Sequence, residues 1–237
     1  MIDVTAIITG HREGLLCGPS IESAQQAINF ALELGIVVEL IAVLDAPDDL
    51  TLSMFRNNAH LYKKLVVTDF HDPGLARNRG VQEASGRFVT FLDGDDLWSF
   101  NWIAAAYNTI NRLETEAIIH SEINLIFGEM RQLWLHIDST SPYCDPKYLQ
   151  IGNFWDAMSF APKEIYLKHP FHKNDLVSGY GHEDWHWNCV TLSTGIDHLP
   201  AKGTVHMKRR RKMSQIIKAE GSDAVPWPNA ISSYLEY

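Results

Sequence analysis

Four short, almost uninterrupted apolar runs punctuate the first hundred positions of the chain. They are Val4 to Thr9, Ile36 to Leu44, Leu61 to Thr68 and Phe88 to Leu92. Each run is too short for a buried helix, and stretches with helical periodicity lie between them. Strands that are apolar on both faces and alternate with helices form parallel sheets covered on both sides. The sequence therefore predicts a single α/β domain around a Rossmann-like, mainly parallel central sheet.

Other patterns predict the remaining elements. Pro19-Ser20 opens a helix that Gly35 ends. Residues 118–127 and 131–137 form a hairpin around Gly128-Glu129. We expect further helices near 49–60, 75–84, 99–115 and 183–194, and short strands near 196–199 and 204–207. We divide the chain into a domain of residues 1–218, with halves 1–115 and 116–218, and an exposed C-terminal arm of residues 219–237.

Composition excludes several classes of protein. Among the 237 residues, 46% are apolar and 21% are charged, as in ordinary globular proteins. The net charge of −9 argues against nucleic acid as a partner, because binding phosphates needs a basic face. The three cysteines are far apart and odd in number, which favours a reducing compartment over a disulfide framework. No apolar segment is long enough to span a bilayer. We expect a soluble cytoplasmic protein.

Acidic residues follow the fourth apolar run directly. In open parallel sheets, ligands bind outside the carboxyl ends of the strands, which directs attention to Asp93-Gly94-Asp95-Asp96. The simple interpretation is a solvated acidic turn. The alternative is a site for Mg²⁺ or Mn²⁺, which prefer carboxylate oxygens and share their shell with substrate phosphates. An EF-hand is excluded because Trp98 and Ala104 stand where its glycine and closing glutamate belong. We favour the metal and diphosphate site.

The residues around this turn carry a family resemblance. "GLARNRGVQEASGRFVTFLDGDD" (74–96) resembles the nucleotide-sugar half of the family 2 glycosyltransferases. "AIITGHRE" and "LIAVLDAPDDLT" upstream are similar to the family's first two strands, and "GYGHEDW" and "HMKRRRKMS" downstream to its acidic segment and basic loop. The five pieces follow in the family's order and cover residues 4 to about 214.

This resemblance implies a GT-A fold and an inverting transfer from a nucleotide-diphosphate sugar, most often UDP-linked, to a hydroxyl of a glycan or lipid-linked acceptor, as in polysaccharide biosynthesis. It implies Mn²⁺ or Mg²⁺ as cofactor, bound with the donor by residues 1–115, and an acceptor bound by residues 116–218. Asp45 corresponds to the acid that binds the donor's base, and Arg77 to the arginine on the nucleotide side. Thr9 and His11 take the positions that line the base pocket.

The D-x-D motif of the family corresponds to Asp93, near the ribose and the metal, and Asp95, the metal ligand. His206 takes a position where some relatives supply a further metal ligand, although a structural histidine is the simpler interpretation. Two departures leave the base open: His11-Arg12 replaces the family's Tyr-Asn, and Ala46-Pro47 replaces an acidic Gly-Ser turn.

The stretch "GYGHEDWHWN" (179–188) has two interpretations. His182 to His186 spells H-E-x-x-H, a helical zinc clamp of metallopeptidases. The metzincin continuation fails, since Cys189 and Leu192 replace its glycine and third histidine, and a distal ligand would have to be Glu220. Alternatively, Glu183-Asp184 are acids in the first turn of a helix. The resemblance makes Asp184 the general base, Glu183 an acceptor-positioning residue and the adjacent Trp185 a stacking face for the acceptor.

The basic run Lys208 to Lys212 also has several interpretations. The resemblance favours a loop over the diphosphate, with Arg210 and its neighbours Arg209 and Arg211 as ligands. Contact with an anionic membrane at its inner face, or a solvated loop, are the alternatives. Three other functions stay open at this point: a nucleotidyltransferase, a non-catalytic nucleotide-sugar binding module and the zinc metallopeptidase.

Overall fold

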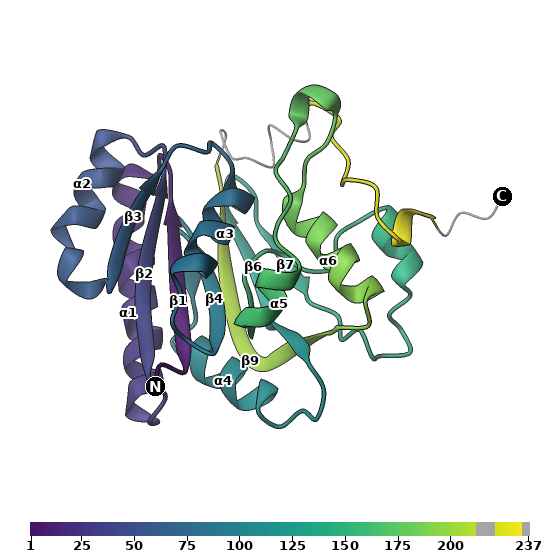
Figure 1. Ribbon diagram of the computed structural model, residues 1–237, viewed down its shortest axis with the longest axis horizontal. Coiled ribbons are helices and arrows are strands. Elements are labelled where there is room, and N and C mark those ends of the chain that lie inside the picture. The colour runs from purple at the N-terminus through teal and green to yellow at the C-terminus, as the bar shows by residue number, and fades with distance from the viewer. Residues whose placement is uncertain (212–220, 234–237) are drawn as a thin grey trace.

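The four apolar runs form four parallel strands at one side of a single curled sheet. The computed structural model describes residues 1–211 and 221–233. Its first strands are β1 (Val4–Gly10), β2 (Val38–Asp45), β3 (Lys64–Thr68) and β4 (Phe88–Asp93). They lie in the order β3-β2-β1-β4, and every neighbouring pair is parallel (Figure 1). The prediction of an α/β domain with a mainly parallel central sheet is confirmed.

Helices cover both faces of these strands because successive strand residues point to opposite sides. Ile8 packs in one apolar cluster with helices α1 and α4, whereas Ile7 packs in another with α3, α5 and α6. The bounds are α1 (Cys17–Glu33), α2 (Asp49–Asn57), α3 (Pro73–Glu83), α4 (Trp102–Ile110), α5 (Lys163–Lys168) and α6 (Glu183–Ser193). α1 begins before Pro19, whose missing N–H is harmless in a first turn, and Gly35 ends it with a φ of 82°.

The second half extends the same sheet with mixed pairing. β8 (Ser159–Pro162) lies antiparallel between β4 and β6 (Ala117–Gly128), and β7 (Gln132–Leu135) closes the predicted hairpin with β6. The two short strands expected near 196–207 are one strand, β9 (Asp197–Arg210), parallel to β6. A register irregularity separates the two paired stretches of β9, and Gly203 has a φ of 74° there, which explains the apparent break. The short β5 (Leu97–Trp98) pairs antiparallel with β9.

The described part of the C-terminal segment, residues 221–233, is mostly exposed but contacts the domain at several positions. Val225 exchanges backbone hydrogen bonds with Gly179 and Gly181, and Trp227 stacks on Tyr180 with 4.1 Å between ring centroids. Ile231 is buried in a cluster with residues of α6. The segment therefore contacts the domain at these positions, while most of its described residues are exposed as expected of an arm. The proposed boundary at residue 218 lies outside the described residues. Within the described ranges, no helix is long and apolar enough to cross a bilayer.

Candidate functional site

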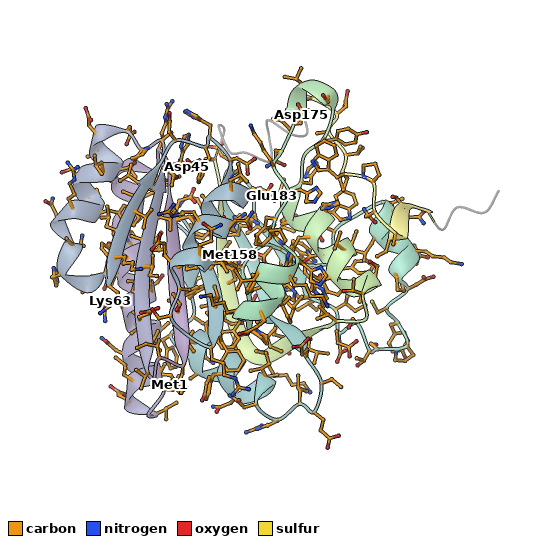
Figure 2. The ribbon with its side chains drawn as sticks, in the orientation of Figure 1. Met1, Asp45, Lys63, Met158, Asp175 and Glu183 are labelled. Atoms are coloured by element: carbon orange, nitrogen blue, oxygen red, sulfur yellow. The ribbon has the colours of Figure 1, made fainter. Side chains whose placement is uncertain are left out.

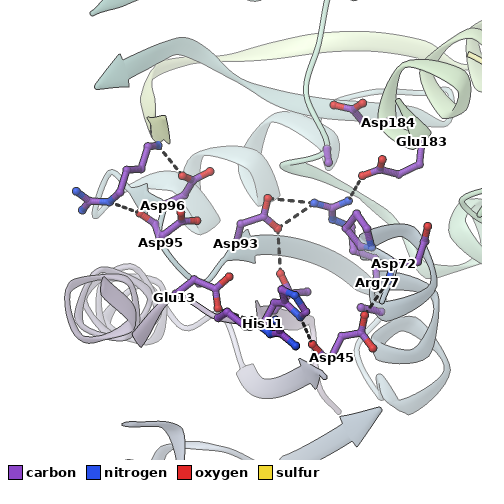
Figure 3. Close-up of a pocket in the computed structure, with 18 of the residues that line it drawn as sticks. His11, Glu13, Asp45, Asp72, Arg77, Asp93, Asp95, Asp96, Glu183 and Asp184 are labelled. Atoms are coloured by element: carbon purple, nitrogen blue, oxygen red, sulfur yellow. Dashed lines mark hydrogen bonds and ion pairs between the residues drawn. The ribbon is translucent and has the colours of Figure 1, made fainter. Parts of the chain in front are cut away.

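One cavity lies at the carboxyl ends of the central parallel strands. Its volume is about 360 Å³, and its lining comes from the ends of β1, β2 and β4, the beginnings of α3 and α6 and the end of β9. Asp45, Asp93, Asp95 and Asp184, which are distant in the sequence, all line it (Figure 3). Figure 2 shows Asp45 and Glu183 toward the same edge of the sheet, and both residues line this cavity. The sheet geometry thus brings the predicted donor and acceptor residues together.

The acid turn, residues 93–96 at the end of β4, is shaped by Gly94. A Cβ atom there would lie 2.6 Å from the carbonyl oxygen of Thr9, so only glycine fits against β1. Thr9 donates from Oγ1 to Asp93 Oδ1 at 2.9 Å, and Asp96 accepts from the backbone N–H of Arg209 at 2.7 Å. The turn is therefore held between β1 and β9, and Thr9 acts through its hydrogen bond to Asp93.

Asp95 has one close basic partner, Arg211, whose Nε lies 2.5 Å from Asp95 Oδ2. Burial and the neighbouring charge of Asp96 raise the pKa of the Asp95 carboxyl to about 7, with the opposing guanidinium of Arg211 too weak to restore it. Glu13 lies on the other side of this guanidinium, with 3.4 Å between Arg211 Nη2 and its Oε1. Asp95 is thus a buried acid with a surplus of negative charge around it.

The base side of the cavity is built around Asp45. Its Oδ1 accepts from Thr68 Oγ1 and from the backbone N–H of Phe70, and its Oδ2 accepts from the N–H of Asp72. Asp45 therefore orders the loop after β3 as well as lining the cavity. His11 bonds through Nδ1 to the carbonyl oxygen of Asp45.

His71 was missed by the sequence reasoning. It lines the cavity edge-on to His11, with 6.2 Å between ring centroids. Its φ of 56° lies in the left-handed region, which non-glycine residues rarely adopt and which no sequence pattern here indicated. Together the two imidazoles supply aromatic faces at the position predicted for the base.

Arg77 lies beneath the cavity rather than over it. Its side chain is 4% exposed and forms ion pairs with Asp93 from β4 and with Glu183 from α6, at 2.9 and 2.8 Å. Although burial alone raises the pKa of the Asp93 carboxyl, the guanidinium of Arg77 lowers it below the usual value. Glu183 is also bonded to Asn174 Nδ2, at 3.0 Å. Arg77 and Glu183 thus pair with each other while both line the cavity, and their nucleotide and acceptor contacts stay predictions.

Asp184 begins α6 beside the cavity. Its Oδ1 accepts from the N–H of Trp185 at 2.8 Å, a group left unpaired at any helix N-terminus. Burial and then the negative charge of Glu183 raise the pKa of the Asp184 carboxyl, while Lys208 and Arg77 oppose that rise. Among the described residues, no basic side chain forms an ion pair with Asp184. It is a carboxylate with raised proton affinity that faces the cavity.

Trp185 turns away from the cavity, contrary to the prediction of an acceptor-stacking face. Its indole N–H donates to the carbonyl oxygen of Leu149 at 2.7 Å, and its ring packs on the buried cluster that includes Ile231. Neighbouring residues of a helix point about 100° apart, so the residue after a cavity-facing acid points elsewhere.

The zinc clamp fails on geometry. His182 precedes α6 with a left-handed backbone (φ 57°), so the two histidines do not share a helix face. His186 donates from Nδ1 to the carbonyl oxygen of Trp227, and it is not among the residues that line the cavity. Across residues 1–211 and 221–233, no group of three metal-binding side chains is preformed. The proposed distal ligand Glu220 lies outside the described residues.

His206 is also placed differently from its predicted role as a metal ligand. It does not line the cavity, and its two ring nitrogens face Asp156 and Asp96 at 2.8 and 3.2 Å. Although burial lowers the pKa of this imidazole, Asp156 and then Asp96 raise it to about 9. His206 is thus paired with two buried carboxylates in this structure, and its role as a metal ligand stays a prediction.

Alternation along β9 sorts the basic run into two sets. Lys208 lies 3.9 Å from Asp156 and senses the charge of Asp184, whereas Arg209 and Arg211 reach the acid turn. Arg210 lines the cavity, as predicted for a substrate ligand. Lys208 was not singled out from the sequence, although its strand position beside His206 was the available signal. Lys212 and the Met213-Ser214 pair lie outside the described residues.

The acid turn has the donor chemistry for a divalent cation. Among the described residues, the cavity lining includes eight carboxylates against six lysine and arginine side chains. Burial first, and then the negative charge of its neighbours, raises the pKa of Asp95, and a bound cation would offset both. Carboxylate oxygens are the ligands Mg²⁺ and Mn²⁺ prefer, with the remaining positions filled by water and phosphate. Asp95 and Asp93 therefore fit such an ion.

Curated proteins and solved structures include chains similar to this one. The amylovoran biosynthesis glycosyltransferase AmsB of Erwinia amylovora is 42% identical over 55 residues, covering 22% of this chain and 18% of the relative. The uncharacterized glycosyltransferase YibD of Escherichia coli (strain K12) is 22% identical over 174 residues, covering 67% of this chain and 49% of the relative. This chain thus spans about half or less of the length of these relatives.

The fold resembles S. aureus TarS (residues 1–349) in complex with UDP-GlcNAc, with a TM-score of 0.68 and 14% identity over 91% of this chain and 61% of that one. It also resembles the mannosyltransferase PcManGT from Pyrobaculum calidifontis in complex with GDP-Man and Mn²⁺, with a TM-score of 0.62 and 16% identity over 89% and 58% of the two chains. The family model "Glycosyl transferase family 2" matches residues 7–171, most of the chain. The protein therefore belongs to glycosyl transferase family 2.

Proposed function

We propose that this protein transfers a sugar, with inversion, from a UDP-linked donor to a hydroxyl of a glycan or lipid-linked acceptor, using Mn²⁺ or Mg²⁺. The observation that carries the proposal is the shared cavity. It holds the acid turn that ends β4 and, across from it, a carboxylate with a raised pKa at the start of α6. A single displacement needs both groups at once. The acid turn would hold the cation that neutralises the leaving diphosphate, and the carboxylate would accept the proton of the acceptor hydroxyl.

Asp184 is the general base in this proposal. Its raised pKa brings it closer to neutral pH, where a base is most effective, while the N-terminus of α6 keeps it ionised. The acceptor hydroxyl donates its proton to Asp184 as its oxygen attacks the anomeric carbon. Asp184 is not held by a basic side chain, so its carboxylate is available to the acceptor.

The leaving diphosphate belongs at the acid turn and the end of β9. A divalent cation on Asp95 and Asp93 would neutralise the charge that develops there as a Lewis acid. Arg210 and Arg211 at the same end add fixed positive charge for the phosphate oxygens.

The donor's base belongs near Asp45, His11 and His71. The bound ligands of TarS and PcManGT, UDP-GlcNAc and GDP-Man, support a nucleoside-diphosphate sugar. We assign UDP on the resemblance of the motifs. The proposal places the reaction in polysaccharide biosynthesis in the cytoplasm, with the basic run available for a membrane carrying a lipid-linked acceptor.

A thermal-shift panel tests this proposal. UDP, GDP and ADP are each added with and without Mn²⁺, and one diphosphate should raise the Tm only when Mn²⁺ is present. The same panel on Asp95→Asn should show no Mn²⁺-dependent rise. Equal stabilisation of both proteins would remove the metal from the proposal, and no stabilisation by any nucleotide would overturn it.

A further inference from the structure

A chain of hydrogen bonds runs beneath the cavity from the donor half of the molecule to the acceptor half. Asp72 donates its N–H to Asp45 Oδ2 at 2.8 Å and accepts the N–H of Asn174 on its own Oδ2 at 2.8 Å. Asn174 in turn donates from Nδ2 to Glu183 Oε2 at 3.0 Å. The start of α6 is therefore tied to the loop after β3.

The chain continues from Glu183 back to the acid turn. Glu183 Oε1 accepts from Arg77 Nη1 at 2.8 Å, and Arg77 Nη2 reaches both oxygens of Asp93, at 2.9 and 3.1 Å (Figure 3). The Arg77 and Glu183 side chains are 4% and 11% exposed. We call Asp93, Arg77 and Glu183 the carboxylate bridge.

Each member of the bridge is held by partners inside the protein. Both oxygens of Glu183 have a partner, and both Nη atoms of Arg77 are bonded. Each oxygen of Glu183 keeps a further lone pair, but Arg77 and Asn174 set its position. This arrangement gives Glu183 a structural role beside the acceptor contact expected of it.

We propose that Arg77 and Glu183 are positioning residues, and that the carboxylate bridge couples the nucleotide and cation end of the cavity to the placement of Asp184. This inference rests on the proposed function. Glu183 is anchored on the side of α3, so the next residue of the helix, about 100° around the axis, faces the cavity. The left-handed backbone of His182 immediately before it shows that the approach to α6 is fixed by its surroundings.

The coupling follows from the sharing of one guanidinium between two carboxylates. When Glu183 is replaced by the neutral glutamine, the positive charge of Arg77 acts on Asp93 alone. Arg77 then competes more strongly with a divalent cation for the Asp93 carboxylate. Glu183→Gln should therefore weaken nucleotide binding in the presence of Mn²⁺.

Calorimetric titration of UDP at saturating Mn²⁺ tests this directly. Glu183→Gln should raise the Kd about five-fold or more relative to the unchanged protein. The matched control is Glu164→Gln, an exposed acid in the first turn of α5 that loses the same charge, and its Kd should not change. Equal UDP affinity for Glu183→Gln and the unchanged protein would overturn the bridge.

Two further variants keep the test decisive. The ammonium of a lysine cannot bridge Asp93 and Glu183 as the planar guanidinium of Arg77 does. In an Arg77→Lys background, adding Glu183→Gln should therefore change the Kd for UDP less than about two-fold. An undiminished effect would contradict transmission through Arg77. Glu183→Asp keeps the charge but shortens the arm, so it should retain UDP affinity and lower kcat. A loss of affinity with normal kcat would contradict the positioning role.

The same titrations separate the two proposals. If the unchanged protein binds neither UDP nor GDP, the proposed function is overturned. If it binds UDP and the Glu183 variants bind equally well, only the bridge is overturned.

Discussion

The acid turn after β4 and the acid pair that begins α6 are both carboxylate clusters in one cavity, yet their partners differ. Asp95 in the turn has a direct ion pair with Arg211 at the end of β9. Among the residues that the structure describes, Asp184 in the pair has only a backbone N–H within hydrogen-bonding distance, while its neighbour Glu183 forms the ion pair with Arg77. The comparison teaches that a carboxylate placed to bind a metal cation can form an ion pair that the cation replaces. A carboxylate placed to accept a proton has no such ion pair.

Removing the proton acceptor should have the largest effect. Asp184→Asn keeps the size and the backbone hydrogen bond but loses proton affinity, so transfer should fall by about 10²–10⁴-fold. UDP affinity, measured by titration, should change less than about two-fold. Near-normal turnover would remove Asp184 from the mechanism and erase the difference between the two acids.

At the acid turn, Asp95→Asn should reduce Mn²⁺-dependent UDP binding by about 10-fold or more, because it removes one charged ligand of the cation. Isothermal titration with and without Mn²⁺ measures this. The control Asp49→Asn removes an exposed acid from the first turn of α2 and should leave binding unchanged. Identical Mn²⁺ dependence in both variants would place the cation elsewhere.

The exchangeable partner can be tested on its own. Arg211→Ala removes the positive charge that competes for Asp95, so Mn²⁺ alone should bind about two- to five-fold more tightly, the size of one partly exposed ion pair. Electron paramagnetic resonance of free Mn²⁺ gives the Kd, and Arg112→Ala serves as an exposed control. Weaker Mn²⁺ binding would show that Arg211 supports the cation site instead of opposing it.

Stability should depend on pH through Asp95. Its pKa is about 7 in the folded protein against 3.8 ordinarily, so the folded state binds more protons than the unfolded state between these values. The stability contributed by this group is complete below about pH 4 and is lost as pH rises to 7. Without metal, the Tm of Asp95→Asn minus that of the unchanged protein should therefore increase from pH 5 to pH 8. A constant difference would contradict the raised pKa.

Trp185→Phe should have the smallest effect. It removes one indole hydrogen bond to the carbonyl of Leu149, which costs about 0.5–1.5 kcal/mol of unfolding free energy. The kinetic constants for transfer should stay unchanged, since the ring points away from the cavity. Urea unfolding measures the free energy of unfolding, and an acceptor titration measures the kinetic constants. A rise in the KM for the acceptor would support the predicted stacking of Trp185 on the acceptor.

The parallel strands and the acid turn were predictable because local patterns specify them. The apolar runs gave β1 to β4, and the D-G-D-D motif located the turn that Gly94 shapes against β1. The bridge was not predictable in its role, because Arg77 and Glu183 are 106 positions apart and either could equally have faced a substrate. The packing of residues 221–233 was hidden for the same reason, since no local pattern in their sequence reveals a distant partner such as Tyr180.

The alternation of β9 has a consequence for which sequence changes the protein can tolerate. Substitutions at single positions alter one basic side chain, but inserting or deleting one residue between the irregularity at Gly203 and Lys208 would exchange the two faces of the strand. Arginines that now serve the acid turn would then point at Asp156, and the lysine beside Asp184 would point away. Insertions and deletions in functional variants of this protein should therefore be confined to loops outside this segment, because side chains in those loops do not have to alternate between two faces.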